Sequence, residues 1–311
     1  MISNAGWHLR NRALESPLLR RFFNRARAAV GQKPPFFEFE PVSGNRPKFD
    51  RLMRLPPAER TFIVVFTPRS GSSWVTRLAE QTGVLSQPGE CFHPGFMPAM
   101  TRFFETGTLQ EYVAILRRKR ATGGLFGFEV TMGHVTATFG TFRQMIAMFP
   151  DATVFSLIRE DVVAQAVSLL KMQQTQVGHR GDGDEARFAD AEELFHYDPD
   201  GIRLWVQRLV RLEAAAERAF DAHGITPHRL SYERNVALGA QGVLDVLARQ
   251  IGDLPPISAP PDPPARRTGS TRNDEFSTRF RQENSDWLAG IAAQRGVWLD
   301  KLPPVDGCEK P

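Results

Sequence analysis

The stretch VVFTPRSGSSWVTRLAEQTG, Val64 to Gly83, decides the fold of this chain. It overlaps an apolar run, TFIVVF (61–66), whose β-branched and aromatic residues predict a buried strand. A short polar loop follows, and SSWVTRLAEQTGV then has the pattern of an amphipathic helix with Gly83 as its stop. Strand, tight loop and helix N-terminus predict an anion site, because backbone N–H groups converge there and the helix dipole favours negative charge.

The side chains of this loop suit a phosphate group. Arg69 offers a charged fork, and Gly71 lets the backbone approach a ligand. Hydroxyl donors come from Ser70, Ser72 and Ser73. A Walker loop, GxxxxGK(S/T), would place a lysine beside a γ-phosphate, and this loop has neither that lysine nor that spacing. The pattern indicates a nucleotide without a triphosphate; a plain Ser/Gly turn is the alternative.

Strands and helices alternate after this loop. Further strands are predicted at 125–132, 152–158 and 228–232, and helices at 141–150, 161–175, 202–224, 237–252 and 273–289. Such alternation predicts an α/β fold with a central parallel sheet flanked by helices.

Arg159 and Ser168 form a second candidate position for an anion. Arg159 ends the third predicted strand, where ligands of open parallel sheets gather, and Ser168 lies two turns into the next helix. Both could reach a second phosphate if that helix leans toward the loop. Alternatively, Arg159 pairs with Asp161, its neighbour two residues on, and Ser168 is an ordinary helix serine.

The composition bounds the class of protein. The 311 residues carry a net charge of +4, which suits an anionic ligand but is too mild to indicate nucleic acid. The two cysteines, Cys91 and Cys308, form no metal or disulfide framework, which favours a reducing compartment. We find no apolar run of membrane-spanning length and no signal-peptide pattern, so we expect a cytoplasmic protein.

Residues 1–50 differ from the remainder, and we expect the catalytic domain to cover 51–311. The first 30 residues combine arginines with apolar residues at helical spacing, and 31–50 resemble an extended linker rich in Pro and Gly. A helix packed on the domain or on a second subunit fits this pattern, as does peripheral contact with an inner membrane surface. The charged, Gly-rich stretch 176–200 predicts a mobile loop or lid.

Four motifs in order resemble the Stf0-type sulfotransferases, a bacterial family. They are TPRSGSSW (67–74), RED…QAVSLL…QQTQ (159–176), GITPHRLSYE (224–233) and RRTGSTRNDEFSTRFRQE (266–283). The resemblance covers roughly residues 60–285 and implies a P-loop-like sulfotransferase fold. It also implies 3'-phosphoadenylyl sulfate (PAPS) as the donor, without a metal, and a hydroxyl of a carbohydrate or glycolipid as the acceptor.

The resemblance also implies roles for single residues. The segment Arg69–Ser73 would hold the 5'-phosphosulfate, while Arg159 and Ser168 would hold the 3'-phosphate. An aromatic such as Trp74 stacks on adenine, Tyr232 lies near it, and Arg267 belongs to the segment that closes over the nucleotide. Core packing is the competing interpretation for both aromatics, and a solvated charge is the competing interpretation for Arg267.

Glu90, in SQPGECFHP, is the candidate catalytic base by this resemblance, and Arg69 would stabilise charge on the leaving oxygen. His93 and His134 are rival bases, because an imidazole titrates near neutral pH. Cys91 replaces an aromatic that the family commonly has after this glutamate. Glu129 stands where the family commonly has a lysine, which puts the acceptor class in doubt more than the reaction.

Two other functions remain open. A kinase-like P-loop enzyme would need ATP and magnesium, and the missing Walker lysine counts against it. A degenerate sulfotransferase fold would bind without turnover; Arg159, Ser168 and Glu90 argue against it, although Glu129 leaves room for it.

Overall fold

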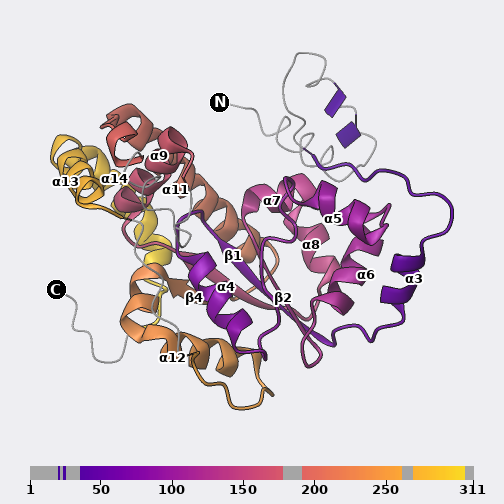
Figure 1. Ribbon diagram of the computed structural model, residues 1–311. Coiled ribbons are helices and arrows are strands. Elements are labelled where there is room, and N and C mark those ends of the chain that lie inside the picture. The colour runs from indigo at the N-terminus through magenta and orange to yellow at the C-terminus, as the bar shows by residue number, and fades with distance from the viewer. Residues whose placement is uncertain (1–19, 22–23, 26–35, 178–190, 261–268, 305–311) are drawn as a thin grey trace.

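A central sheet of four parallel strands organises the molecule (Figure 1). The computed structural model describes residues 20–21, 24–25, 36–177, 191–260 and 269–304. The strands are β1 (Arg60–Phe66), β2 (Leu125–Val130), β3 (Thr153–Ile158) and β4 (His228–Ser231). Their order is β2-β1-β3-β4, and every pairing is parallel. The predicted α/β class with a parallel sheet is confirmed.

Apolar residues of β1 alternate between the two faces of the sheet. Ile63 and Val65 pack into one core, whereas Phe62, Val64 and Phe66 pack into another. Both faces are therefore covered, as the uninterrupted apolar run of this strand predicts.

Eleven helices with assigned bounds surround the sheet in the described part of the chain. They are α3 (Pro47–Met53), α4 (Ser72–Gln81), α5 (Met97–Phe104), α6 (Leu109–Lys119), α7 (Met132–Thr138), α8 (Phe142–Met148), α9 (Val162–Thr175), α11 (Pro199–Ala222), α12 (Tyr232–Ile251), α13 (Thr271–Glu283) and α14 (Ser285–Leu299). In Figure 1, α5 to α8 lie on one side of the molecule, and α9, α11, α13 and α14 gather on the other. None of the described helices is long and apolar enough to cross a membrane.

Two strands end earlier than the sequence predicted, each for a local reason. The second strand stops at Val130, because the Thr131 hydroxyl accepts the N–H of His134 and begins α7. The fourth strand stops at Ser231, which caps α12 in the same way, so Tyr232 lies in the first turn of a helix.

Other helices differ from the sequence prediction. Pro47 begins α3 inside the predicted linker, since proline is tolerated at the first position of a helix. The sequence did not predict α5 and α6. The single tail helix predicted at 273–289 is two helices, α13 and α14, which meet at Asn284.

The segment before β1 packs on the domain. Phe37 and Phe39 lie against the core that includes Tyr112, and the N–H of Phe37 donates to the carbonyl of Ala137. Further upstream, the guanidinium of Arg20 donates to the carbonyl of Phe139. These contacts tie Arg20 and part of the predicted linker to α7 and its neighbours.

Residues 191–200 of the predicted lid pack on the domain. Phe195 is buried among α9, α11 and α13, and Glu192 pairs with Lys171 of α9. The apolar side chains of Ala191 and Phe195 explain this packing. The sequence prediction missed it because most of the segment is charged. Residues 178–190, the other part of that prediction, lie outside the described residues.

Candidate active site

The loop after β1 is held by the strand and helix beside it. The N–H of Thr67 donates to the carbonyl of Leu157 in β3, at 3.3 Å. From α9, the buried amide of Gln165 donates to Thr67 Oγ1 at 2.9 Å and to the carbonyl of Pro68 at 2.7 Å. Gln165 thus fixes the start of the loop. In the sequence, its place in the QAVSLL motif was the one signal for this role.

Gly71 completes the loop and lies beneath the ring of Tyr232. Its φ of +83° belongs to the left-handed region, and a Cβ there would lie 2.7 Å from Cδ2 of Tyr232. The guanidinium of Arg159 lies 4.7 Å from the centroid of the same ring. The structure therefore brings together the loop, the strand end after β3 and the first turn of α12.

Arg69 joins this cluster from within the loop. Its Nε donates to Ser168 Oγ at 3.0 Å, so Ser168 of α9 contacts the loop arginine directly. Burial and the nearby charge of Arg159 lower the pKa of Arg69. Two guanidinium groups this close, with a buried Ser70 hydroxyl that has no partner among the described residues, fit an anionic ligand.

Arg159 pairs with Glu233 and not with Asp161, the partner that the sequence offered as an alternative. Its Nε lies 3.5 Å from Glu233, whereas Asp161 caps α9 and pairs with Arg281 of α13. The alternative pairing of Arg159 with Asp161 is therefore not what the structure shows. Glu233 also accepts the N–H groups of Glu160 and Asp161, which fixes the turn after β3.

Arg295 of α14 holds the backbone at this strand end. Its guanidinium donates to the carbonyls of Arg159 and Glu160, both at 2.6 Å, and pairs with Glu213 of α11. The side chains of Arg295 and Glu213 are 3% and 1% exposed, so the pair is buried. Sequence reasoning missed Arg295, because a charged residue in a terminal helix is normally expected in solvent.

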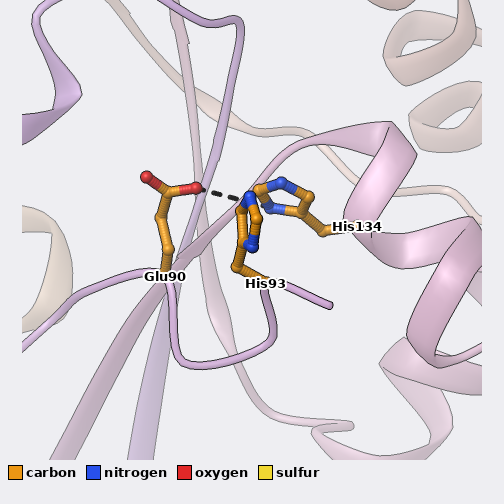
Figure 2. A group of neighbouring side chains, drawn as sticks. All are labelled: Glu90, His93 and His134. Atoms are coloured by element: carbon orange, nitrogen blue, oxygen red, sulfur yellow. Dashed lines mark ion pairs between the residues drawn. The ribbon is translucent and has the colours of Figure 1, made fainter. Parts of the chain in front are cut away.

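The second half of the site contains Glu90, His93 and His134 (Figure 2). Glu90 Oε2 lies 3.7 Å from His134 Nδ1, and the two histidine rings are 4.6 Å apart between centroids. Burial raises the pKa of Glu90, although His93 opposes this shift. Burial lowers the pKa of His134 to about 4, which leaves its ring neutral at neutral pH. The structure thus brings together the predicted base and both rivals.

The same three side chains are close enough to hold a metal ion, since their ligand atoms lie within 4.8 Å of one another. Both imidazoles, however, already have a bond to one nitrogen. Nδ1 of His134 accepts the N–H of Thr131 at 3.4 Å, and Nδ1 of His93 accepts that of Gly95 at 2.9 Å. His134 therefore helps to cap α7.

Glu129 connects the two halves of the site. It lies near the carboxyl end of β2 and is 4% exposed, and its N–H donates to the carbonyl of Gly89 at 3.2 Å. Its carboxyl group bonds the hydroxyl of Ser72 and lies near Glu90. Burial, with a smaller contribution from Glu90, raises the pKa of Glu129 to about 8.

The remaining predicted residues have different surroundings. Trp74 is half-buried and packs against the core beneath α4 and α12, so the core interpretation describes at least part of this ring. Ser72 is buried and Ser73 is exposed at the start of α4. Arg267 lies outside the described residues.

Residues 61–283 match the model of the Stf0 sulphotransferase family. The chain belongs to this family. It is also 28% identical over 272 residues to trehalose 2-sulfotransferase of Mycobacterium tuberculosis (strain ATCC 35801 / TMC 107 / Erdman), with 73% of this chain and 96% of that protein covered.

The Stf0 match begins in β1 and ends with α13, so it includes both halves of the site. The recognition from four sequence motifs is confirmed. The last helix, α14, lies beyond the Stf0 match, although its Arg295 holds the backbone of Arg159.

Proposed function

We propose that this chain transfers the sulfuryl group of PAPS to a hydroxyl of a carbohydrate or glycolipid. The observation that carries the proposal is the meeting of Arg69 and Arg159 at a loop in contact with Tyr232, with Glu90 near Glu129, whose carboxyl group bonds Ser72 of the same loop and helix. The first group offers two cations to a bisphosphate, and the second offers a base to a hydroxyl. Membership in the Stf0 family supports sulfuryl transfer as the reaction.

The donor side of the site follows from charge and shape. When bound, PAPS supplies a sulfuryl group on a phosphate leaving group. Arg69 and the N–H groups at the start of α4 stabilise negative charge on the bridging oxygen. Arg159, braced on Tyr232, faces the 3'-phosphate, and Ser168 orients Arg69 through its hydroxyl.

Glu90 is the base of the proposed reaction. Its raised pKa makes its carboxylate a better proton acceptor than an exposed glutamate, and the acceptor hydroxyl would give its proton there. His134 Nδ1 lies 3.7 Å from this carboxylate and accepts the N–H of Thr131, so the neutral ring places no positive charge beside Glu90. Because sulfuryl transfer resembles phosphoryl transfer, positioning and charge stabilisation contribute most of the rate.

The acceptor side favours a sugar. The ring of Phe96 is 57% exposed and lies 4.6 Å from that of His93, next to Glu90. An apolar ring surface beside a polar base suits the face of a pyranose and its hydroxyl groups. The relative named as a trehalose 2-sulfotransferase supports the same acceptor class.

The test is to incubate the full chain with labelled PAPS and a panel of free sugars and glycolipids, and to identify labelled products by mass spectrometry. We expect a sulfated carbohydrate and adenosine 3',5'-bisphosphate (PAP) in equal amounts. Binding of PAP without any product would indicate a scaffold. Binding of ATP with magnesium but not of PAP would indicate a kinase-like enzyme.

A further inference from the structure

Glu129 is a buried carboxyl group on β2, the strand beside the one that leads into the phosphate loop. Its side chain reaches Ser72, the first residue of α4, which follows Gly71 in the loop. Oε2 of Glu129 is buried and has no hydrogen-bond partner among the residues that the structure describes. A polar atom left without a partner in the interior is costly, so this oxygen indicates a bonding group that a ligand supplies.

The surrounding charges determine which form of the carboxyl group can bind such a ligand. An ionised Glu129 would repel both Glu90 and an anion at the loop. A neutral carboxylic acid has an O–H that can donate to an anion, as backbone N–H groups do. The hydroxyl of Ser72 can donate to the other carboxyl oxygen, which leaves the O–H available.

We propose that Glu129 binds the donor nucleotide as a neutral carboxylic acid, donating its O–H to an anionic oxygen of the phosphosulfate. This inference rests on the proposed function. It gives the two neighbouring carboxyl groups opposite roles: Glu90 accepts a proton from the acceptor, and Glu129 donates a hydrogen bond to the donor. When the surroundings of two neighbouring carboxyl groups give them different pKa values, one commonly acts as an acid and the other as a base.

The proposal predicts a loss of affinity at alkaline pH. With a pKa of about 8, Glu129 is mostly protonated at pH 7 and about nine-tenths ionised at pH 9. Binding restricted to the protonated form would weaken about tenfold across this interval. Of the titratable groups that face Glu129, Glu90 has its pKa raised by burial, and Cys91 has its pKa raised to about 12 by burial.

The experiment measures the affinity of the full chain for PAP by calorimetry between about pH 7 and pH 9. In this range the phosphates of PAP are already ionised. We expect the wild-type affinity to fall about tenfold. Glu129→Gln keeps a donor at every pH and should bind about as well as wild type at pH 7, without the alkaline loss. Glu129→Ala should bind about tenfold more weakly at every pH.

Glu80→Gln is the matched control, because it removes an exposed carboxylate from α4, the helix that begins at Ser72, and should keep the wild-type pH dependence. An infrared difference spectrum between wild type and Glu129→Gln at pH 7 should show a protonated carboxyl band. A wild-type affinity that does not change with pH, or an alkaline loss that persists in Glu129→Gln, would overturn the inference. No PAP binding at any pH would overturn the proposed function itself.

Discussion

The ring of Tyr232 lies so close over Gly71 that a Cβ at position 71 would be 2.7 Å from Cδ2 of the tyrosine. The same glycine has a φ of +83°, which disfavours any other residue. Two separate constraints therefore act on one position of the phosphate loop. The guanidinium of Arg159 packs on the same ring, so Tyr232 contacts both the loop and the second cation.

Gly71→Ala should disturb both the loop and its ligand. We expect a loss of unfolding free energy of about 1 kcal/mol from the positive φ and about 1 to 3 kcal/mol from the close contact. PAP affinity should fall at least about tenfold, measured by calorimetry. The matched control is Gly83→Ala, whose φ is +64° but whose Cβ would meet nothing within 4 Å. Equal effects of both variants would show that contact with Tyr232 has no role.

Arg159→Ala should show which phosphate of the nucleotide Arg159 binds. If Arg159 faces the 3'-phosphate, the variant should lose about ten- to hundredfold in affinity for PAP, as expected for a charged hydrogen bond. Adenosine 5'-phosphosulfate lacks that phosphate and should lose no more than about twofold. Arg77→Ala removes an exposed charge from α4 and should change neither affinity. Equal losses for both ligands would place Arg159 elsewhere.

Glu90→Gln should lower turnover and leave nucleotide binding intact. Removal of a general base costs about 10²- to 10⁴-fold in rate. PAP affinity should stay within about twofold of wild type, because the proposed function assigns Glu90 to the acceptor and not to the nucleotide. Steady-state rates and calorimetry on one preparation give both values. An unchanged rate would assign the base to His93 or His134.

His134→Gln should make the protein less sensitive to acid. The ring has a pKa of about 4 in the fold, against about 6.5 when unfolded. The unfolded state therefore binds more protons between these values, and stability falls by about 3 kcal/mol as pH drops through this window. Glutamine suits the third position of a capping box, so α7 should persist.

The measurement for this variant is chemical denaturation at several values of pH between about 4 and 7. The acid slope of His134→Gln should be shallower than that of wild type. His223→Gln, an exposed histidine after α11, should keep the wild-type slope. An unaltered slope in His134→Gln would mean that another group causes acid sensitivity.

Arg295→Ala should be the most destabilising of these changes, because it leaves Glu213 buried without its partner. Breaking a buried ion pair costs about 3 to 5 kcal/mol. The double variant Glu213→Gln with Arg295→Met should recover part of this stability, yet its PAP affinity should stay low, since Arg159 loses its backbone anchor. Arg279→Ala breaks an exposed pair and should change little. Wild-type affinity in the double variant would refute the anchoring role.

The sequence predicts those parts of the fold that can be recognised from a single local segment. The apolar run of β1 and the loop after it need no distant partner to be recognised. The ends of β2 and β4 were less clear, because Thr131 and Ser231 are as compatible with a strand as with a helix cap. Short helices such as α5 have no such clear signal, since proline and aromatic residues dominate MPAMTRFF.

The site shows the same limit. Motif order located Arg69, Arg159 and Tyr232, but spacing alone gave no sign that the ring of Tyr232 lies over Gly71. Ser168 was expected beside Arg159, and the structure places its hydroxyl on Arg69. Such pairings depend on how helices lean across the sheet, which only tertiary packing determines.

The burial of Arg295 has a consequence for how the molecule opens. Because its guanidinium holds the carbonyls of Arg159 and Glu160, α14 cannot detach without releasing the turn after β3. Amide hydrogens of α14 should therefore exchange with solvent in the same cooperative event as those of that turn. A nucleotide bound to Arg159 would suppress this event. The amide hydrogens of α14 would therefore exchange more slowly when the loop holds a ligand.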